Sequence, residues 1–291
     1  MLRSVQVLPL VAALGYSAGA IAAGAASSHG HDEHHGQVPN EVIAEQRAEL
    51  AKNTKGKGFG PQSPRDLDSR EGRNSILFSA TPAYEDMHLC NIHFHKNAEH
   101  KGGQFTVYAG NGDGHGYQSG YKYSGKLSAA ELKPASACPS KHGSLSSGDT
   151  IEVHYVHSTA QVKPGPTLGS CLSESIKNSQ LRVETQVYVL VNDRNAFDFR
   201  KLTRHGIKNG RPQAVHIPGN TGTPIEYAGS TTGPSYNEKG SLFQVTWSVR
   251  PKVAKVDIAT VDAWCKDNVF EEDHAHGVRN LVINPDLLSK L

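Results

Sequence analysis

Residues 88–96 read "HLCNIHFHK", a run in which histidines alternate with apolar side chains. Successive side chains of a β-strand point to opposite faces of the sheet. His93 and His95 are therefore expected to share one face with Leu89 and Asn91. The other face is expected to carry Cys90, Ile92 and Phe94. Two imidazoles about 6.5–7 Å apart along a strand can converge on one metal ion, so the run predicts a strand with two candidate ligands.

A second run, "DTIEVHYVHST" (149–159), supplies a third imidazole. In a strand, Glu152, His154 and Val156 face one way, while Ile151, Val153 and Tyr155 face the other. A lone histidine in a buried strand is usually a hydrogen-bonded core residue. Beside the paired histidines of a neighbouring strand, however, His154 completes a set of three neutral imidazoles. Three protein ligands leave one tetrahedral position open, which is typical of a catalytic zinc that lowers the pKa of its bound water to about 7.

The rest of the chain is rich in short apolar or alternating runs bounded by Gly and Pro. Five of them read as strands: 86–96, 104–109, 150–158, 181–191 and 242–250. Late in the chain, only "TVDAWCKDNVF" and "NPDLLSKL" have a helical pattern. The sequence predicts a mainly β protein with a single domain over residues 61–291.

The N-terminal residues predict export. Arg3 precedes the apolar run Val5–Leu14, and small residues follow as cleavage sites, so residues 1–26 are predicted to be a signal peptide. Pro9 and Gly15 interrupt the run, which argues against a membrane anchor. The mature protein is expected to be periplasmic or secreted.

Residues 27–60 are expected to form a flexible arm and a short amphipathic helix with Asn40 as its N-cap. The arm holds four histidines: His29, His31, His34 and His35. It could gather metal ions weakly, or it could be a linker with no role of its own.

Charge and cysteine content limit the expected binding partners and predict disulfide bonds. With 30 basic and 28 acidic residues, the chain has no electrostatic reason to bind nucleic acid or an anionic membrane. In an exported protein, four isolated cysteines predict disulfides. Of the three possible pairings we favour Cys138 with Cys171, because they flank one strand, which leaves Cys90 with Cys265.

Five ordered blocks together resemble a bacterial delta-class carbonic anhydrase and, more distantly, the alpha class. They are "PQSP" (61–64), "NIHFHKNAEHKGG" (91–103), "IEVHYVH" (151–157), "YAGSTTGP" (227–234) and "FQVTWSVRP" (243–251). The resemblance implies an alpha-carbonic-anhydrase-like fold, with a central twisted, mostly antiparallel β-sheet and a few short helices. It implies a lyase that hydrates CO2 reversibly to bicarbonate and a proton by a zinc-bound hydroxide.

The resemblance also assigns roles to single residues. His93, His95 and His154 match the zinc ligands, and Co²⁺ is a possible substitute for zinc. Thr232 matches the threonine that accepts a hydrogen bond from the zinc-bound hydroxide, and Glu99 matches the glutamate that takes the proton of that threonine.

Further residues match the surroundings of the metal. Asn91 and Glu152 would orient His93 and His154, as hydrogen-bond partners of metal-bound histidines do. Residues expected to form the apolar wall for CO2 are Val156, Val189, Thr231 and Trp247.

No residue matches the proton-shuttle histidine of the alpha class, because the segment that carries it is shortened. By pKa alone, His88, His100, His115 and His157 are candidates. A second His-x-His pair, His274 and His276, lies in "EEDHAHG" and is expected to be part of a surface acidic loop, with incidental metal binding as the less favoured alternative.

Two other functions remain open. "HFHKNAE" also fits the HxHxxxE pattern of cupins, in which Glu99 would be a fourth ligand to iron or manganese. Alternatively, the chain could be an exported, carbonic-anhydrase-like zinc-binding protein without turnover.

Overall fold

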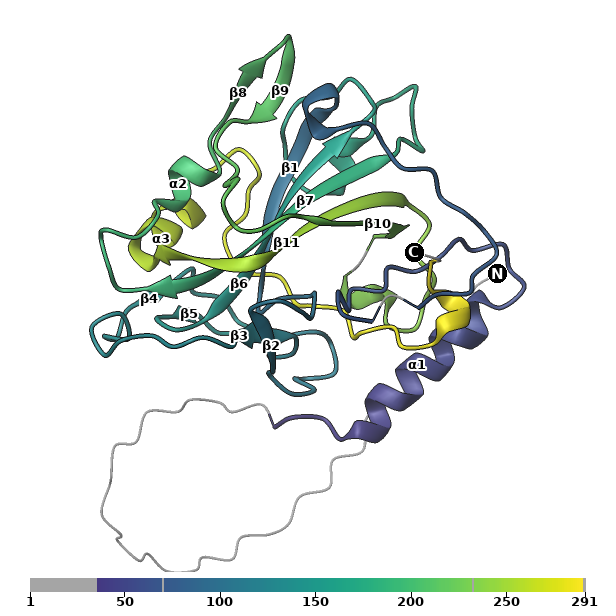
Figure 1. The fold of residues 1–291 in the computed structure, drawn as a ribbon, viewed down its shortest axis with the longest axis horizontal. Coiled ribbons are helices and arrows are strands. Elements are labelled where there is room, and N and C mark those ends of the chain that lie inside the picture. The colour runs from purple at the N-terminus through teal and green to yellow at the C-terminus, as the bar shows by residue number, and fades with distance from the viewer. Residues whose placement is uncertain (1–35, 70, 232, 290–291) are drawn as a thin grey trace, which may run out of the picture. The chain divides into compact units, whose positions relative to one another are not determined.

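A five-stranded sheet forms the centre of the fold in the computed structural model, which describes residues 36–69, 71–231 and 233–289. The strands follow the order β1-β6-β7-β11-β10 across the sheet (Figure 1). Their bounds are His88–Lys96 (β1), Thr150–Ser158 (β6), Leu181–Val191 (β7), Gln244–Asp257 (β11) and Ile225–Ser230 (β10). Adjacent strands are antiparallel except for β7 and β11, which run parallel. The predicted mainly β class and mostly antiparallel sheet are confirmed.

The sheet is buried on both faces at its centre, because every residue of β6 and β7 is buried. One face packs on α2 (Phe199–Leu202) and α3 (Ile258–Lys266), around aromatic side chains such as Phe94 and Trp264. The other face packs around Trp247 and carries the candidate ligands. Burying both faces accounts for the nearly continuous apolar character of the central strands.

The alternation predicted for β1 is wrong at its start. The pairing of β1 with β6 shifts register between Leu89 and Asn91, which is a β-bulge. An extra residue in one strand reverses the faces on either side of it. Leu89 therefore joins the core on the side of Ile92, whereas Cys90 joins the core on the side of the histidines.

The remaining elements are short. The small strands are β2 (Phe105–Tyr108), β3 (Tyr121–Tyr123), β4 (Ser136–Ala137), β5 (Leu145–Ser146), β8 (His205–Lys208) and β9 (Arg211–Ala214). The 3-10 turns are η1 (Tyr84–Asp86), η2 (Leu168–Cys171), η3 (Pro234–Tyr236) and η4 (Pro285–Leu287). Of the two late segments expected to be helical, the first gives α3 and the second only η4. Strand β10 was not predicted as a strand.

The predicted N-terminal helix is present as α1 (Asn40–Thr54), but its cap differs from the expectation. Pro39 is the N-cap residue, and it provides no side-chain hydrogen bond. The Oδ1 of Asn40 instead accepts a hydrogen bond from the Nδ2 of Asn111, 2.9 Å away. Leu50 of α1 packs against the C-terminal residues Val282, Leu287 and Leu288. The boundary at residues 60 and 61 remains a prediction, and residues 1–35, with the expected signal peptide and histidine arm, lie outside the described residues.

All four cysteines are in disulfides, but the expected pairing is wrong. Cys90 is bonded to Cys171, and Cys138 to Cys265. The second bond joins Cys138, directly after the short strand β4, to Cys265 of α3. These two cysteines are 127 residues apart in sequence. Closeness along the chain misled the prediction, because the fold brings distant segments together. Within the described residues, no helix has the length and apolar character needed to cross a membrane.

Candidate metal centre

Three histidine rings meet on one face of the sheet. His93 and His95 come from β1, and His154 comes from the neighbouring strand β6. His93 and His154 are direct cross-strand partners, which places their side chains together. One ring nitrogen from each of the three residues lies within 4.8 Å of the others. The structure thus brings together the three residues that the sequence singled out.

Hydrogen bonds hold the two rings of β1 in place. The Nδ1 of His93 donates to the Oδ1 of Asn91 at 2.6 Å. The Nδ1 of His95 donates to the backbone carbonyl of Gly277 at 2.8 Å. With the proton held on Nδ1, each Nε2 keeps a free lone pair. The Nε2 of His95 is buried and has no hydrogen-bond partner.

The third ring is held the other way round. The Nε2 of His154 donates to the Oε1 of Glu152 at 2.7 Å, so its Nδ1 carries the free lone pair. That Nδ1 lies 3.2 Å from the Nε2 of His93. Buried nitrogen lone pairs that face one another without a proton are unfavourable unless a cation lies between them. The donor set therefore fits a divalent metal ion that prefers imidazole.

Glu152 is a fully buried carboxylate that lies between the rings of His100 and His154. Its Oε1 accepts hydrogen bonds from His154 and from the Nδ1 of His100, both at 2.7 Å. The Nε2 of His100 in turn is 2.6 Å from the hydroxyl of Tyr227. Burial alone would raise the pKa of Glu152, but the two imidazoles hold it well below its usual value. The cluster of His100, Glu152 and His154 is thus a hydrogen-bond network, and Glu152 stays ionised.

Both β1 histidines are neutral at physiological pH. Burial lowers the pKa of His95 to about 4, with a further contribution from the neighbouring rings. Burial, followed by the nearby His154 and His95, lowers the pKa of His93 well below its usual value. Neutral imidazoles can bind a metal without first losing a proton.

Glu99 is buried beside the centre but on the outer side of His95. Its Oε1 lies 3.8 Å from the Nδ1 of His95, and 3.8 Å from the Nη1 of Arg65. Burial would raise the pKa of Glu99, but His95 and Arg65 bring it to about 2. Because it faces the nitrogen that carries the proton, Glu99 is not placed as a fourth ligand, and the cupin interpretation is wrong. Thr232, its expected partner, lies outside the described residues.

A small apolar cavity of about 40 Å³ opens beside the three rings. The predicted wall residues Val156, Thr231 and Trp247 line it. Val189 does not, since it pairs with Thr150 at the other end of β7. Val183, which pairs with Val156, takes that place. Leu168 and Leu181 complete the wall, and nothing in the sequence pattern pointed to them.

The loop that carries the second histidine pair lies at the rim of the centre, which corrects its interpretation as a simple surface loop. The backbone of His276 pairs with β1, donating to the carbonyl of Phe94 at 2.9 Å. Its ring lies 5.7 Å from that of His93 and 5.8 Å from that of His95, centroid to centroid. No local sequence pattern indicates this contact, because the two segments are far apart in the chain.

The four candidate shuttle histidines lie in different environments. His100 and His157 are fully buried, and burial lowers the pKa of His157 to about 3. His88 begins β1, and His115 lies in an exposed turn. None of these four lines the cavity beside the triad.

Comparison with known proteins identifies the family. The delta carbonic anhydrase family profile matches residues 84–260, a span that includes the whole triad. The chain belongs to the delta carbonic anhydrase family. No curated protein sequence matches it.

Three solved structures are similar to this family member at low identity. A hyperthermostable carbonic anhydrase from an active hydrothermal vent chimney is 15% identical, with a TM-score of 0.26, over 81% of this chain and 90% of its own. The alpha-carbonic anhydrase from Thermovibrio ammonificans, in complex with sulfanilamide, is 17% identical, with a TM-score of 0.27, over 81% and 89%. The Photobacterium profundum alpha-carbonic anhydrase is 16% identical, with a TM-score of 0.27, over 81% and 94%.

Proposed function

We propose that this chain is a zinc-dependent carbonic anhydrase that hydrates CO2 reversibly to bicarbonate and a proton. The observation that carries the proposal is the convergence of three imidazoles, from His93, His95 and His154, each oriented by its own hydrogen bond. Membership of the delta carbonic anhydrase family supports the same reaction. A bound zinc ion supplies Lewis-acid chemistry that makes water a nucleophile at neutral pH.

The chain's own residues would hold and orient the reactants. Asn91, the Gly277 carbonyl and Glu152 keep the protons on the outer ring nitrogens, which leaves the inner ones free for the metal. The apolar wall of Val156, Val183 and Trp247 suits CO2, which has no net dipole and gains little from polar partners.

Orientation of the attacking water would depend on Thr232 and Glu99, as the family resemblance implies. An ionised carboxylate can only accept hydrogen bonds, so Glu99 would accept a hydrogen bond from the hydroxyl of Thr232. The pKa of Glu99, about 2, keeps it ionised at every physiological pH. Because the Thr232 hydroxyl would donate its proton in a hydrogen bond to Glu99, it could only accept a hydrogen bond from the attacking water. This would fix the direction of attack.

The His95→Ala variant tests the proposal. We expect it to lose both stoichiometric zinc, measured by elemental analysis, and CO2 hydration, measured by stopped flow. His216→Ala, at an exposed position after β9, is the matched control and should keep both. Chelation should abolish wild-type hydration, and zinc or Co²⁺ should restore it. Full activity in His95→Ala would refute the proposal.

An exported zinc-binding protein without turnover is the remaining alternative. It predicts stoichiometric zinc together with hydration no faster than that of free zinc in the same buffer. The alternative and the enzyme proposal share the ligands, so only the rate separates them.

We further propose that the protein acts in the periplasm or outside the cell on CO2 and bicarbonate alone, without nucleic acid or membrane partners. The two disulfides support an oxidising compartment. Cell fractionation, with N-terminal sequencing of the mature chain, tests the predicted cleavage near residue 26.

A further inference from the structure

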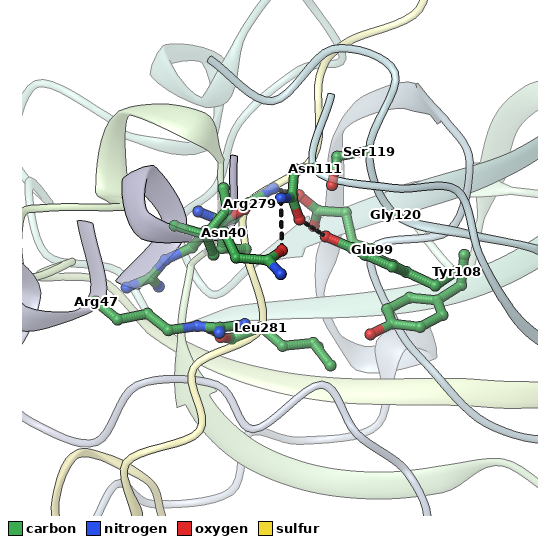
Figure 2. A pocket seen from close by; sticks show the side chains of 12 residues that line it. Asn40, Arg47, Glu99, Tyr108, Asn111, Ser119, Gly120, Arg279 and Leu281 are labelled. Carbon is green, nitrogen blue, oxygen red and sulfur yellow. Dashed lines mark hydrogen bonds between the residues drawn. The ribbon is translucent and has the colours of Figure 1, made fainter. Parts of the chain in front are cut away.

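A second cavity, of about 230 Å³, lies between α1 and the C-terminal segment that follows Gly277 (Figure 2). Asn40 and Arg47 of α1 line it on one side, and Arg279 lines it on the other. Glu99 lies in its wall. The cavity shares no lining residue with the apolar cavity beside the histidine triad. It is therefore a separate cavity, and its lining combines polar and charged side chains with the apolar Ile43 and Leu281.

The guanidinium of Arg279 is buried in this cavity without a full set of partners. The residue is 2% exposed. Its Nη2 donates to the Oε1 of Gln62 at 3.1 Å, whereas Nε and Nη1 have no hydrogen-bond partner. Leaving buried donors of a charged group unpaired is costly, and a bound acceptor would remove that cost.

Positive charge exceeds negative charge around the cavity. Arg47 and Arg279 line it, and the buried Arg65 lies directly behind, with its Nη1 bonded to the Arg279 carbonyl at 2.9 Å. Glu99 is the one carboxylate among the described lining residues, and the Nη1 of Arg65 lies 3.8 Å from it. The backbone N–H of Arg279 also donates to Glu99, at 3.3 Å. Glu99 is thus already compensated, and the charges of Arg47 and Arg279 remain.

The titration behaviour of the lining groups agrees with an uncompensated positive charge. Burial, together with Arg65, lowers the pKa of Arg279 to about 9, and the nearby Glu99 offsets this effect only in part. It still carries its charge at neutral pH. Burial raises the pKa of Tyr121, another lining residue, to about 12, so its hydroxyl stays protonated and adds no negative charge to the cavity.

We propose that this cavity binds a small oxyanion between Arg279 and Arg47, at a site distinct from the metal centre. Guanidinium groups are the preferred partners of carboxylate, phosphate and similar oxyanions, and they make strong charge-assisted hydrogen bonds to them. Arg47, which is half-buried, forms the entrance, with its Nε held by the carbonyl of Leu281 at 3.1 Å. Arg279 forms the buried end.

Inorganic phosphate is the first probe, and bicarbonate is the second. Each is titrated calorimetrically into the metal-free full chain at constant ionic strength, since without a metal the histidine triad offers no cation to an anion. We expect saturable binding of one anion per chain. Arg47→Gln should weaken it about tenfold, because a charge-assisted hydrogen bond is lost at the entrance. Arg279→Gln should abolish it.

The matched control is Arg73→Gln, which removes an exposed arginine that is paired with Asp286 outside the cavity. It should leave the dissociation constant unchanged. If Arg279→Gln unfolds the chain, the half-buried Arg47→Gln variant still tests whether the cavity binds the anion. The proposal is overturned by an absence of saturable binding of either anion, or by equal affinity in wild type and Arg47→Gln. Loss of CO2 hydration alone would concern the proposed function and not this site.

Discussion

Glu152 and His154 lie two residues apart on one strand, and the carboxylate Oε1 accepts the ring N–H of the histidine at 2.7 Å. Because side chains at positions i and i+2 of a strand share a face, the orienting group and the oriented ring are fixed by the same short segment. The carboxylate holds the ring with its Nδ1 toward His93 and His95. The orientation of the third candidate ligand therefore depends on a group outside the three converging rings.

Replacing Glu152 by Gln should weaken zinc binding by about 10–100-fold. The amide keeps one acceptor oxygen but loses the negative charge that holds the rings of both His154 and His100. Competition with a chromophoric chelator measures the dissociation constant. Glu41→Gln, in the first turn of α1, is the control. An unchanged zinc affinity in Glu152→Gln would contradict the orienting role.

Larger side chains on β7 should distinguish an effect on the access of CO2 from an effect on the stability of the fold. Val183 and Val189 are both buried on β7, but only Val183 lines the cavity. Each Val→Phe change should cost about 1–3 kcal/mol of unfolding free energy through overpacking. Only Val183→Phe should also lower kcat/KM for CO2 hydration, by about tenfold or more. Equal activity losses in the two variants would show that the cavity is not the CO2 site.

The two disulfides should have different effects when removed. The change of Cys138 and Cys265 to Ala should cost about 4–5 kcal/mol on the chain-entropy estimate, because the bond closes a loop of 127 residues. It should leave the proposed CO2 hydration by the folded protein intact.

Removal of Cys90 and Cys171 should also destabilise the chain, but it should raise KM as well. Cys171 ends the turn η2, which carries Leu168 of the cavity wall. Denaturant unfolding and stopped-flow kinetics on both double variants check this contrast. A peptide containing Cys138 linked to Cys171, found by non-reducing digestion, would rule out the observed pairing.

Acid should destabilise the protein partly through His157. Its folded-state pKa, about 3, lies below the usual 6.5, because burial disfavours the charged ring. As pH falls, the unfolded chain therefore binds a proton before the folded chain does. The contribution of His157 to the free energy of unfolding is complete above about pH 6.5 and declines toward pH 3. One such group changes the free energy of unfolding by up to about 1.4 kcal/mol per pH unit.

The His157→Asn variant should remove this part of the pH dependence. Asn keeps a donor near the position of Nδ1, which bonds the Tyr155 carbonyl at 3.1 Å, but it does not titrate. The metal-free chain is unfolded by urea at several pH values between 4 and 7. His115→Asn, in an exposed turn, should retain the wild-type slope. A wild-type slope in His157→Asn would show that His157 is not one of the groups responsible.

Much of the centre could be predicted from local patterns. The alternation within 88–96 and 149–159 placed His93, His95 and His154 on strands and on the correct faces, since that alternation needs only neighbouring residues. It failed at Cys90, where a bulge adds a residue that no local pattern announces. The family resemblance misassigned Val189 to the cavity wall, because the position of a wall residue depends on how two strands are registered against each other.

The sequence by itself determined the mainly β class, the long strands and the three imidazoles, because the alternation of side chains along a strand is a local property of the backbone. Only the tertiary structure decided the bulge, the disulfide partners, the Gly277 carbonyl behind His95 and the place of His276. Each of these joins segments that are distant along the chain. Such contacts are set by packing of the whole core, where many pairings are locally equivalent and the best burial selects one.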